Sequence, residues 1–149
     1  MGLDIVHYKN VQFVSVRDDM RDWAQDQVFF MDVRYEEYAA WAGTLKEGFY
    51  LFEVRNFCLQ TSYSGYAEFR DELERLIVKT YQHKRPFREL MDFSDCDGII
   101  CPAMCQVMLN DFKCYQQLAE QMTERNREIY YAIRDALARV GVNDFLSFE

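Results

Sequence analysis

The fold is decided by Ala103–Val140, which reads AMCQVMLNDFKCYQQLAEQMTERNREIYYAIRDALARV. Its apolar side chains fall within an arc of about 120° on a helix wheel, so they share one face of a helix. No Gly or Pro interrupts the pattern before Gly141, and Gly is typical of the position just after a helix end. The stretch predicts one long helix over Ala103–Val140, with any kink near Thr123. The apolar positions are Met104, Met108, Phe112, Tyr115, Leu118, Met122, Ile129, Ile133, Leu137 and Val140.

The length of this predicted helix raises a second expectation. At 1.5 Å per residue it would measure about 57 Å, which exceeds the size of a compact domain of this mass. Either it overhangs and packs on a second copy as a homodimer, or it breaks. We expect the long helix, and an antiparallel hairpin with a turn between Gln121 and Asn126 would contradict it.

Strand patterns stand at the two ends of the chain. Leu3–Tyr8 and Val11–Val16 are rich in β-forming residues and flank a turn signal at Lys9-Asn10, so they predict a hairpin. The tail Val142–Phe148 alternates enough to predict a final strand. Together with the helix, these strands predict an α+β fold: a small antiparallel sheet of the N-terminal strands and the C-terminal tail, packed against several helices.

The spacing of apolar residues in the middle of the chain predicts further elements. They are a short amphipathic helix over Arg17–Asp26, a helix over Glu36–Leu45, a strand over Phe49–Val54, a helix with Ser64 as its N-cap, and a loop or short turn over Pro86–Gly98. No linker or repeat divides the 149 residues, so residues 1–149 are expected to form one globular domain.

The charge balance excludes some partners. Lys and Arg number 17 and Asp and Glu number 25, which gives a net charge of −8 and disfavours nucleic acid and anionic membranes as partners. One basic cluster remains, and we interpret it as a solvated loop in preference to a phosphate site. Asp4 stands where a signal peptide would be basic, and no apolar run is long enough to span a membrane, so a cytoplasmic location is expected. The basic cluster consists of Lys79, His83, Lys84, Arg85 and Arg88.

The cysteines favour the same location. Their number is odd, which disfavours a disulfide framework, and their spacing, C-x4-C-x3-C-x8-C, does not match a structural zinc site. We predict that Cys101 and Cys105 are reduced, buried and free of metal, with no cofactor bound to the chain. The five cysteines are Cys58, Cys96, Cys101, Cys105 and Cys114.

The segment before Gly98 is acidic and is the best candidate for a polar site. Its oxygen-bearing side chains suit a hard cation, but the spacing does not fit an EF-hand loop. A tight turn that caps the following helix is the preferred interpretation. Cys96 lies in the same segment, yet the flanking carboxylates disfavour the thiolate that a nucleophile requires. The acidic turn comprises Asp92, Ser94, Asp95 and Asp97.

Arg70 completes this candidate site. It lies at the edge of the apolar face of its predicted helix, so its charge is expected to be partly buried and to need a partner. We predict pairing with Asp95 or Asp97, which either opens a small polar site to a ligand or only ties the turn to the helix. The second interpretation is preferred, because structural ion pairs often imitate functional sites.

Three motifs stand between Ser62 and the C-terminus: Ser62-Tyr63-Ser64-Gly65-Tyr66-x-x-Phe69-Arg70, Phe93-Ser94-Asp95-Cys96-Asp97-Gly98 and Leu109-x-Asp111-Phe112. They resemble motifs of a family of small uncharacterised bacterial and phage-associated proteins. In that family the patterns are S-Y-S-G-F-x-x-W-R, F-S-D-C-E-G and L-x-x-D-F, followed by a short apolar end strand. Here Phe69 stands for the Trp, Asp97 stands for the Glu, and one residue separates Leu109 from Asp111 where the family pattern has two. The resemblance covers Ser62 to the C-terminus and implies a common fold but no activity.

Three functions remain compatible with the sequence. No nucleotide-binding, nucleophile-elbow or zinc-protease motif is present, and aromatic residues and Arg are abundant, which favours a non-catalytic protein that binds another protein. The alternative is an enzyme or metal-binding protein centred on the acidic turn, Asp92–Gly98. An acidic mimic of nucleic acid is the weakest hypothesis, because Arg residues interrupt the negative charge.

Overall fold

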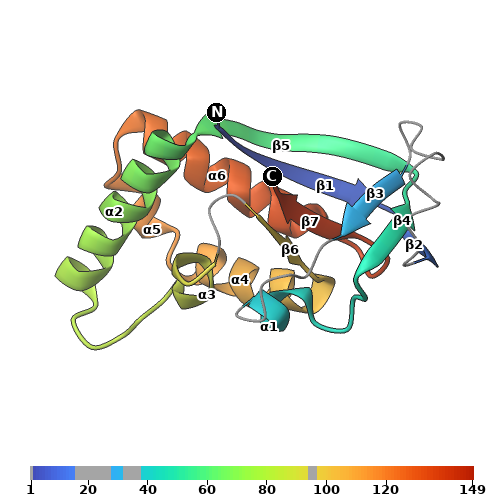
Figure 1. Cartoon of the computed structure of the whole chain (residues 1–149). Coiled ribbons are helices and arrows are strands. Elements are labelled where there is room, and N and C mark those ends of the chain that lie inside the picture. Colours follow the sequence, from blue (N-terminus) through green and yellow to red (C-terminus); the bar gives the residue numbers. More distant parts are fainter. Residues whose placement is uncertain (1, 16–27, 32–37, 94–96) are drawn as a thin grey trace.

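The computed structural model of the chain describes residues 2–15, 28–31, 38–93 and 97–149, and it has an α+β fold. Two antiparallel sheets are accompanied by helices (Figure 1). In chain order the elements are β1 (Gly2–Lys9), β2 (Gln12–Ser15), β3 (Val28–Met31), α1 (Ala39–Ala42), β4 (Gly48–Leu51), β5 (Val54–Ser62), α2 (Tyr63–Thr80), α3 (Arg88–Met91), β6 (Gly98–Ile100), α4 (Pro102–Cys114), α5 (Gln117–Glu120), α6 (Glu124–Arg139) and β7 (Phe145–Phe148).

The larger sheet joins the two ends of the chain. Its strand order is β5-β1-β7-β6, with Ile5 opposite Leu59 on one side and opposite Phe148 on the other. Asp4 and Glu149 exchange two backbone hydrogen bonds of 2.8 Å. The predicted sheet of the N-terminal strand and the C-terminal tail is confirmed, and the strand of the tail is Phe145–Phe148.

The predicted N-terminal hairpin is wrong. β2 pairs with β4 in a second sheet, of order β2-β4-β3, and not with β1. Asn10 has a φ of 52°, a left-handed conformation that Asn tolerates. After this residue the chain leaves the larger sheet, so the turn signal at Lys9-Asn10 separates two sheets.

The two faces of β1 contact different cores, as the two-residue period of a strand requires. Leu3 and Ile5 belong to the main core, which the helices complete. Val6 and Tyr8 point to the other side, where they pack with residues such as Tyr50 of the smaller sheet. The helices α2 and α6 lie against the main-core face of the larger sheet (Figure 1).

The prediction of one helix over Ala103–Val140 is also wrong, because this stretch contains α4, α5 and α6. The chain turns back between Gln121 and Asn126, and α4 packs against α6 in the opposite direction (Figure 1). The Tyr130 hydroxyl donates a 2.6 Å hydrogen bond to the Phe112 carbonyl between these two helices. No overhanging helix exists in this stretch, so the homodimer inferred from it loses its basis.

Tertiary contacts stabilise the break. The Arg127 guanidinium donates to the carbonyls at the end of α5, at Ala119, Glu120 and Met122. Glu72, on α2, accepts a 2.7 Å hydrogen bond from the backbone amide of Thr123, the N-cap of α6. Backbone groups that a continuous helix would pair internally therefore find other partners.

Several boundaries differ from the prediction. The helix expected over Glu36–Leu45 is the single turn α1, and a left-handed Gly43 (φ 61°) ends it. Phe49–Val54 is divided between β4 and β5. The N-cap of α2 is Ser62 and not Ser64, since the Ser62 hydroxyl accepts from the Gly65 amide at 3.0 Å. The helix predicted over Arg17–Asp26 lies outside the described residues.

Candidate functional site

Arg70 connects α2 to the start of the acidic turn. Its side chain is half-buried, its Nη1 donates to the Phe93 carbonyl at 3.3 Å, and its guanidinium lies 4.9 Å from the centre of the Tyr66 ring. This contact brings together two of the sequence motifs. Pairing of Arg70 with Asp95 or Asp97 stays a prediction.

The other predicted site residues are placed only in part. Asp92 and Asp97 are exposed, whereas Ser94, Asp95 and Cys96 lie outside the described residues. Phe93 is buried, with a ring-centre distance of 5.6 Å to Trp41 and 5.0 Å to Phe148. Packing of the Phe93 ring therefore holds the start of the acidic turn against the core.

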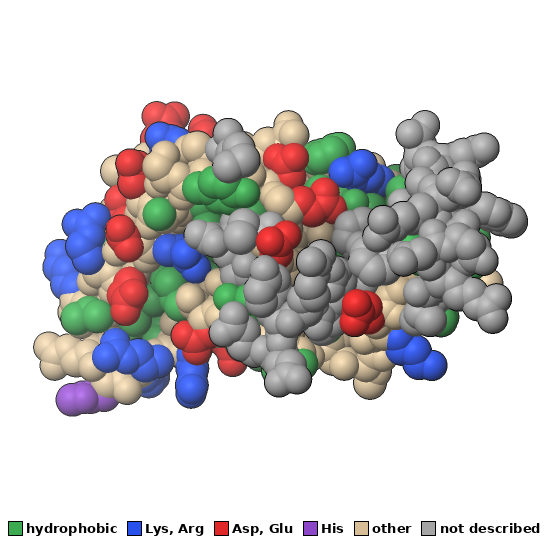
Figure 2. Space-filling model, in the orientation of Figure 1, with side chains coloured by type: hydrophobic (Ala, Val, Ile, Leu, Met, Phe, Trp, Pro, Cys, Tyr) green, Lys and Arg blue, Asp and Glu red, His purple; other side chains and the backbone are tan. Residues whose placement is uncertain are grey.

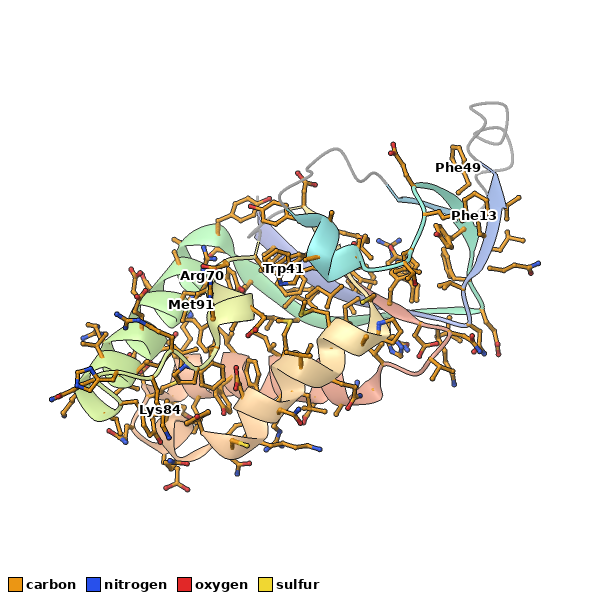
Figure 3. All side chains as sticks on the ribbon, turned by 90° about the horizontal axis from the view of Figure 1, so that it is seen from below. Phe13, Trp41, Phe49, Arg70, Lys84 and Met91 are labelled. Atoms are coloured by element: carbon orange, nitrogen blue, oxygen red, sulfur yellow. The ribbon has the colours of Figure 1, made fainter. Side chains whose placement is uncertain are left out.

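A groove of about 420 Å³ lies beside this turn, between α2 and α3. Residues of the basic cluster and Asp92 of the acidic turn both line this groove, so the structure brings together two features that are separate in the sequence. Figure 3 shows this end of the molecule, with Arg70 and Met91 close together and Lys84 farther out. The lining residues of this α2–α3 groove are Glu74, Ile77, Arg85, Pro86, Arg88, Met91 and Asp92.

The groove has an apolar floor and a charged rim. Ile77 and Pro86 are buried and Met91 is half-buried, whereas the charged lining side chains are all exposed. Arg88 Nε lies 3.4 Å from Asp92 Oδ2, but the two side chains are 77% and 56% exposed. A pair so exposed contributes little to stability, about 0–1 kcal/mol.

Arg85 and Glu74 are two further charged side chains at the same rim. Within the described part of the chain, neither side chain forms a hydrogen bond or an ion pair. The groove can therefore offer one uncommitted guanidinium and one weakly paired guanidinium to a ligand. The two arginines and Asp92 were identified from the sequence, but the residues of the groove floor were not.

Phe87 fixes the rim of the groove to the core. Its φ is 62°, in the left-handed region that an aromatic residue rarely adopts, and its side chain is only 1% exposed. The ring packs against Phe112 at 5.0 Å, and the backbone amide donates a 2.8 Å hydrogen bond to Asp111 Oδ2. The pKa of Asp111 is raised overall, because the effect of burial exceeds the opposite effect of this hydrogen bond. Such strain persists only where the surroundings enforce it.

Two of the cysteines that the structure describes lie in the core. Cys101 and Cys105 are buried, as predicted, and burial raises the pKa of the Cys105 thiol far above its ordinary value. In the ranges that the structure describes, no group of three His, Cys, Asp or Glu side chains is placed to hold a metal ion. The metal-free state of Cys101 and Cys105 stays a prediction.

A second polar cluster lies in the larger sheet. His7 Nε2 is 2.9 Å from Asp144 Oδ2, and the two residues are 4% and 5% exposed. Asp144 also accepts from the backbone amides of Asn10 at 2.9 Å and Gly141 at 2.8 Å. Although burial alone would raise the pKa of Asp144, these hydrogen bonds and His7 hold it below its usual value. The cluster ties the end of α6 to β1.

No family model, no curated protein and no solved structure matches the chain. Across the described residues, no helix is both long and apolar enough to cross a membrane. The α2–α3 groove, with Arg70 and Phe93 at its side, is the candidate site that the geometry supports best.

Proposed function

We propose that the protein is a non-catalytic cytoplasmic module that binds a segment of another protein in the α2–α3 groove. The observation that carries this proposal is the groove itself, where Ile77, Pro86 and Met91 form an apolar floor beneath exposed charges. Interfaces commonly combine an apolar centre with a polar rim and favour Met and Arg. The anchored backbone at Phe87 gives this surface a fixed shape before binding.

A protein segment suits the groove better than a small metabolite. Small-molecule sites bury most of the ligand surface and place a few polar groups inside a concave pocket. Here the side chains of Arg88 and Asp92 remain more than half exposed. A partner that itself covers the rim can exclude water from these charges, whereas a small ligand would leave them in solvent.

The described residues favour neither of the other two functions. Asp92 is exposed and pairs with Arg88, so it does not form a buried acid for catalysis. Figure 2 shows Lys and Arg side chains interspersed with Asp and Glu on the α2 side of the molecule. A nucleic-acid mimic would be expected to mass its negative charge in one area.

Selection of peptides from a phage-displayed random library on the full chain tests this proposal. Met91→Ala should weaken binding of the selected peptides about fivefold or more, because it removes an apolar part of the floor. Met104→Ala is the matched control, since Met104 is also half-buried but lies on α4 and does not line the groove. Circular dichroism checks that both variants fold. Equal binding by the two variants, or no selected peptide, would overturn the proposal.

A further inference from the structure

The basic loop beside the groove is an exception in an acidic chain. Residues 79–88 contain Lys79, Lys84, Arg85 and Arg88 and no Asp or Glu, whereas the whole chain has a net charge of −8. Two of these four cations, Arg85 and Arg88, line the groove. The loop therefore concentrates positive charge beside the groove, although the lining of the groove also includes Glu74 and Asp92.

The arginines can bind a carboxylate without losing a strong interaction. Arg85 has no hydrogen-bond or ion-pair partner in the described part of the chain, and the 3.4 Å contact of Arg88 with Asp92 is exposed to water. A guanidinium matches the two oxygens of a carboxylate and can bind both at once. Glu74 and Asp92 at the same rim repel an anion, so only a carboxylate in direct contact with an arginine is expected to bind in the groove.

The backbone between the two arginines is already ordered. Phe87 is buried, it is left-handed, and its amide is bonded to Asp111, so the positions of Pro86 and Arg88 on either side are constrained by the core. A preformed site loses less conformational entropy on binding than a flexible loop does. A loop whose cations only increase solubility would not need this order, so the order around Phe87 favours a binding role for Arg85 and Arg88.

The floor requires an apolar group next to the anion. Ile77 and Met91 lie within the same groove as the arginines, and Met adapts its shape to different apolar partners. We infer that the groove takes a peptide segment in which an Asp or Glu side chain adjoins a bulky apolar side chain. The carboxylate contacts Arg85 and Arg88, and the apolar side chain lies on Ile77 and Met91. This inference rests on the proposed function of the groove.

Amide substitution of the selected peptides tests the inference. Each peptide is compared with its counterpart in which every Asp and Glu is replaced by Asn or Gln, on the wild type and on the Arg85→Gln/Arg88→Gln variant. On the wild type the change to amides should weaken binding about tenfold or more. On the double variant the acidic and amide peptides should differ by less than about twofold. A Lys113→Gln/Arg139→Gln variant is the control, because it removes the same charge from exposed positions on α4 and α6.

The possible results separate the inference from the proposed function. If Met91→Ala weakens binding but the amide peptides bind as well as the acidic ones, the groove binds peptides and the acidic inference is wrong. If the control variant abolishes the preference for acidic peptides as fully as the Arg85/Arg88 variant does, the preference reflects overall charge and the inference is wrong. If binding ignores Met91→Ala, the proposed function falls and the inference falls with it.

Discussion

The backbone amide of Phe87 donates a 2.8 Å hydrogen bond to the Asp111 carboxylate, which joins the rim of the groove to α4. The rest of the rim depends on this connection, because Arg85, Pro86 and Arg88 have side chains in the groove while Phe87 is buried in the core. The three motifs of the sequence meet around the same segment. Arg70 contacts Phe93 on one side, and Asp111 holds Phe87 on the other.

Replacing Asp111 by Ala should lower the free energy of unfolding by about 1–2 kcal/mol, because the buried Phe87 amide loses its acceptor. Asp111→Asn is the matched control, since its side-chain oxygen can still accept this hydrogen bond. We expect Asp111→Asn to remain within about 0.5 kcal/mol of the wild type. Urea unfolding measures both variants, and equal losses would show that this hydrogen bond does not stabilise the segment.

The pH dependence of stability should differ in sign between Asp144 and Asp111. The pKa of Asp144 is lowered from 3.8 in the folded state, so its contribution is present above about pH 4 and is lost as the pH falls through the lowered value. The stability lost in Asp144→Asn, about 1–3 kcal/mol near neutral pH, should therefore shrink in acid. The pKa of Asp111 is raised from 3.8, so its protonated carboxyl stabilises the folded state below about pH 4, and this contribution is lost as the pH rises through the raised value. The free energy of unfolding of the wild type, relative to that of Asp111→Asn, should therefore increase in acid.

Chemical denaturation of the wild type and the two Asn variants at several pH values measures these differences. His83 is exposed, so a His83→Gln variant is a control for general effects of replacing a titratable residue. A stability difference for Asp144→Asn that grows as the pH falls would contradict the hydrogen-bonded ionised carboxylate.

Gly98→Ala should lower the free energy of unfolding by about 1–3 kcal/mol, the usual effect of overpacking. A Cβ atom at this position would overlap the ring of Phe93. Phe93→Leu should lower the free energy of unfolding less in the Gly98→Ala variant than in the wild type, because the smaller Leu side chain leaves space for the added Cβ atom. Thermal unfolding of the four proteins tests this relationship, and additive losses would contradict the steric explanation.

Arg70→Met should lower the free energy of unfolding by about 1–2 kcal/mol, since it removes the hydrogen bond to Phe93 and the contact with the Tyr66 ring. Double-mutant cycles with Asp95→Asn and Asp97→Asn test the predicted ion pair. One of the two should show a coupling energy above about 0.5 kcal/mol. A loss below about 0.5 kcal/mol for Arg70→Met would mean that these two contacts do not stabilise the fold.

A strand was predictable from the sequence where its apolar side chains follow a two-residue period. Leu3 and Ile5 alternate with residues of the other face, and this period indicates β1 without further information. The partner of β2 was not predictable, because the Lys9-Asn10 signal marks a turn in the chain without specifying where the following strand pairs. β5 was missed as a separate strand, since it runs directly into α2 at Ser62.

The break in Ala103–Val140 shows what an apolar stripe cannot predict. The stripe continues through Leu118 and Met122, which are buried even though the helix has ended nearby. The contacts that stabilise the break come from Arg127 and from Glu72, which is distant in sequence. The candidate site was predictable in the same partial way: Arg70 and Asp92 were identified, but the groove depends on Phe87 and Asp111, whose roles arise only in the folded chain.

The most direct test of the groove is a two-dimensional NMR titration of the full chain with the tightest selected peptide. We expect the largest shifts of backbone amide resonances at Ile77, Arg85, Arg88 and Met91. The exposed edge strand β5 is the rival surface, because its Phe57 side chain is 51% exposed. Largest shifts at Val54 and Phe57, with the resonances of the groove residues unchanged, would contradict peptide binding in the α2–α3 groove.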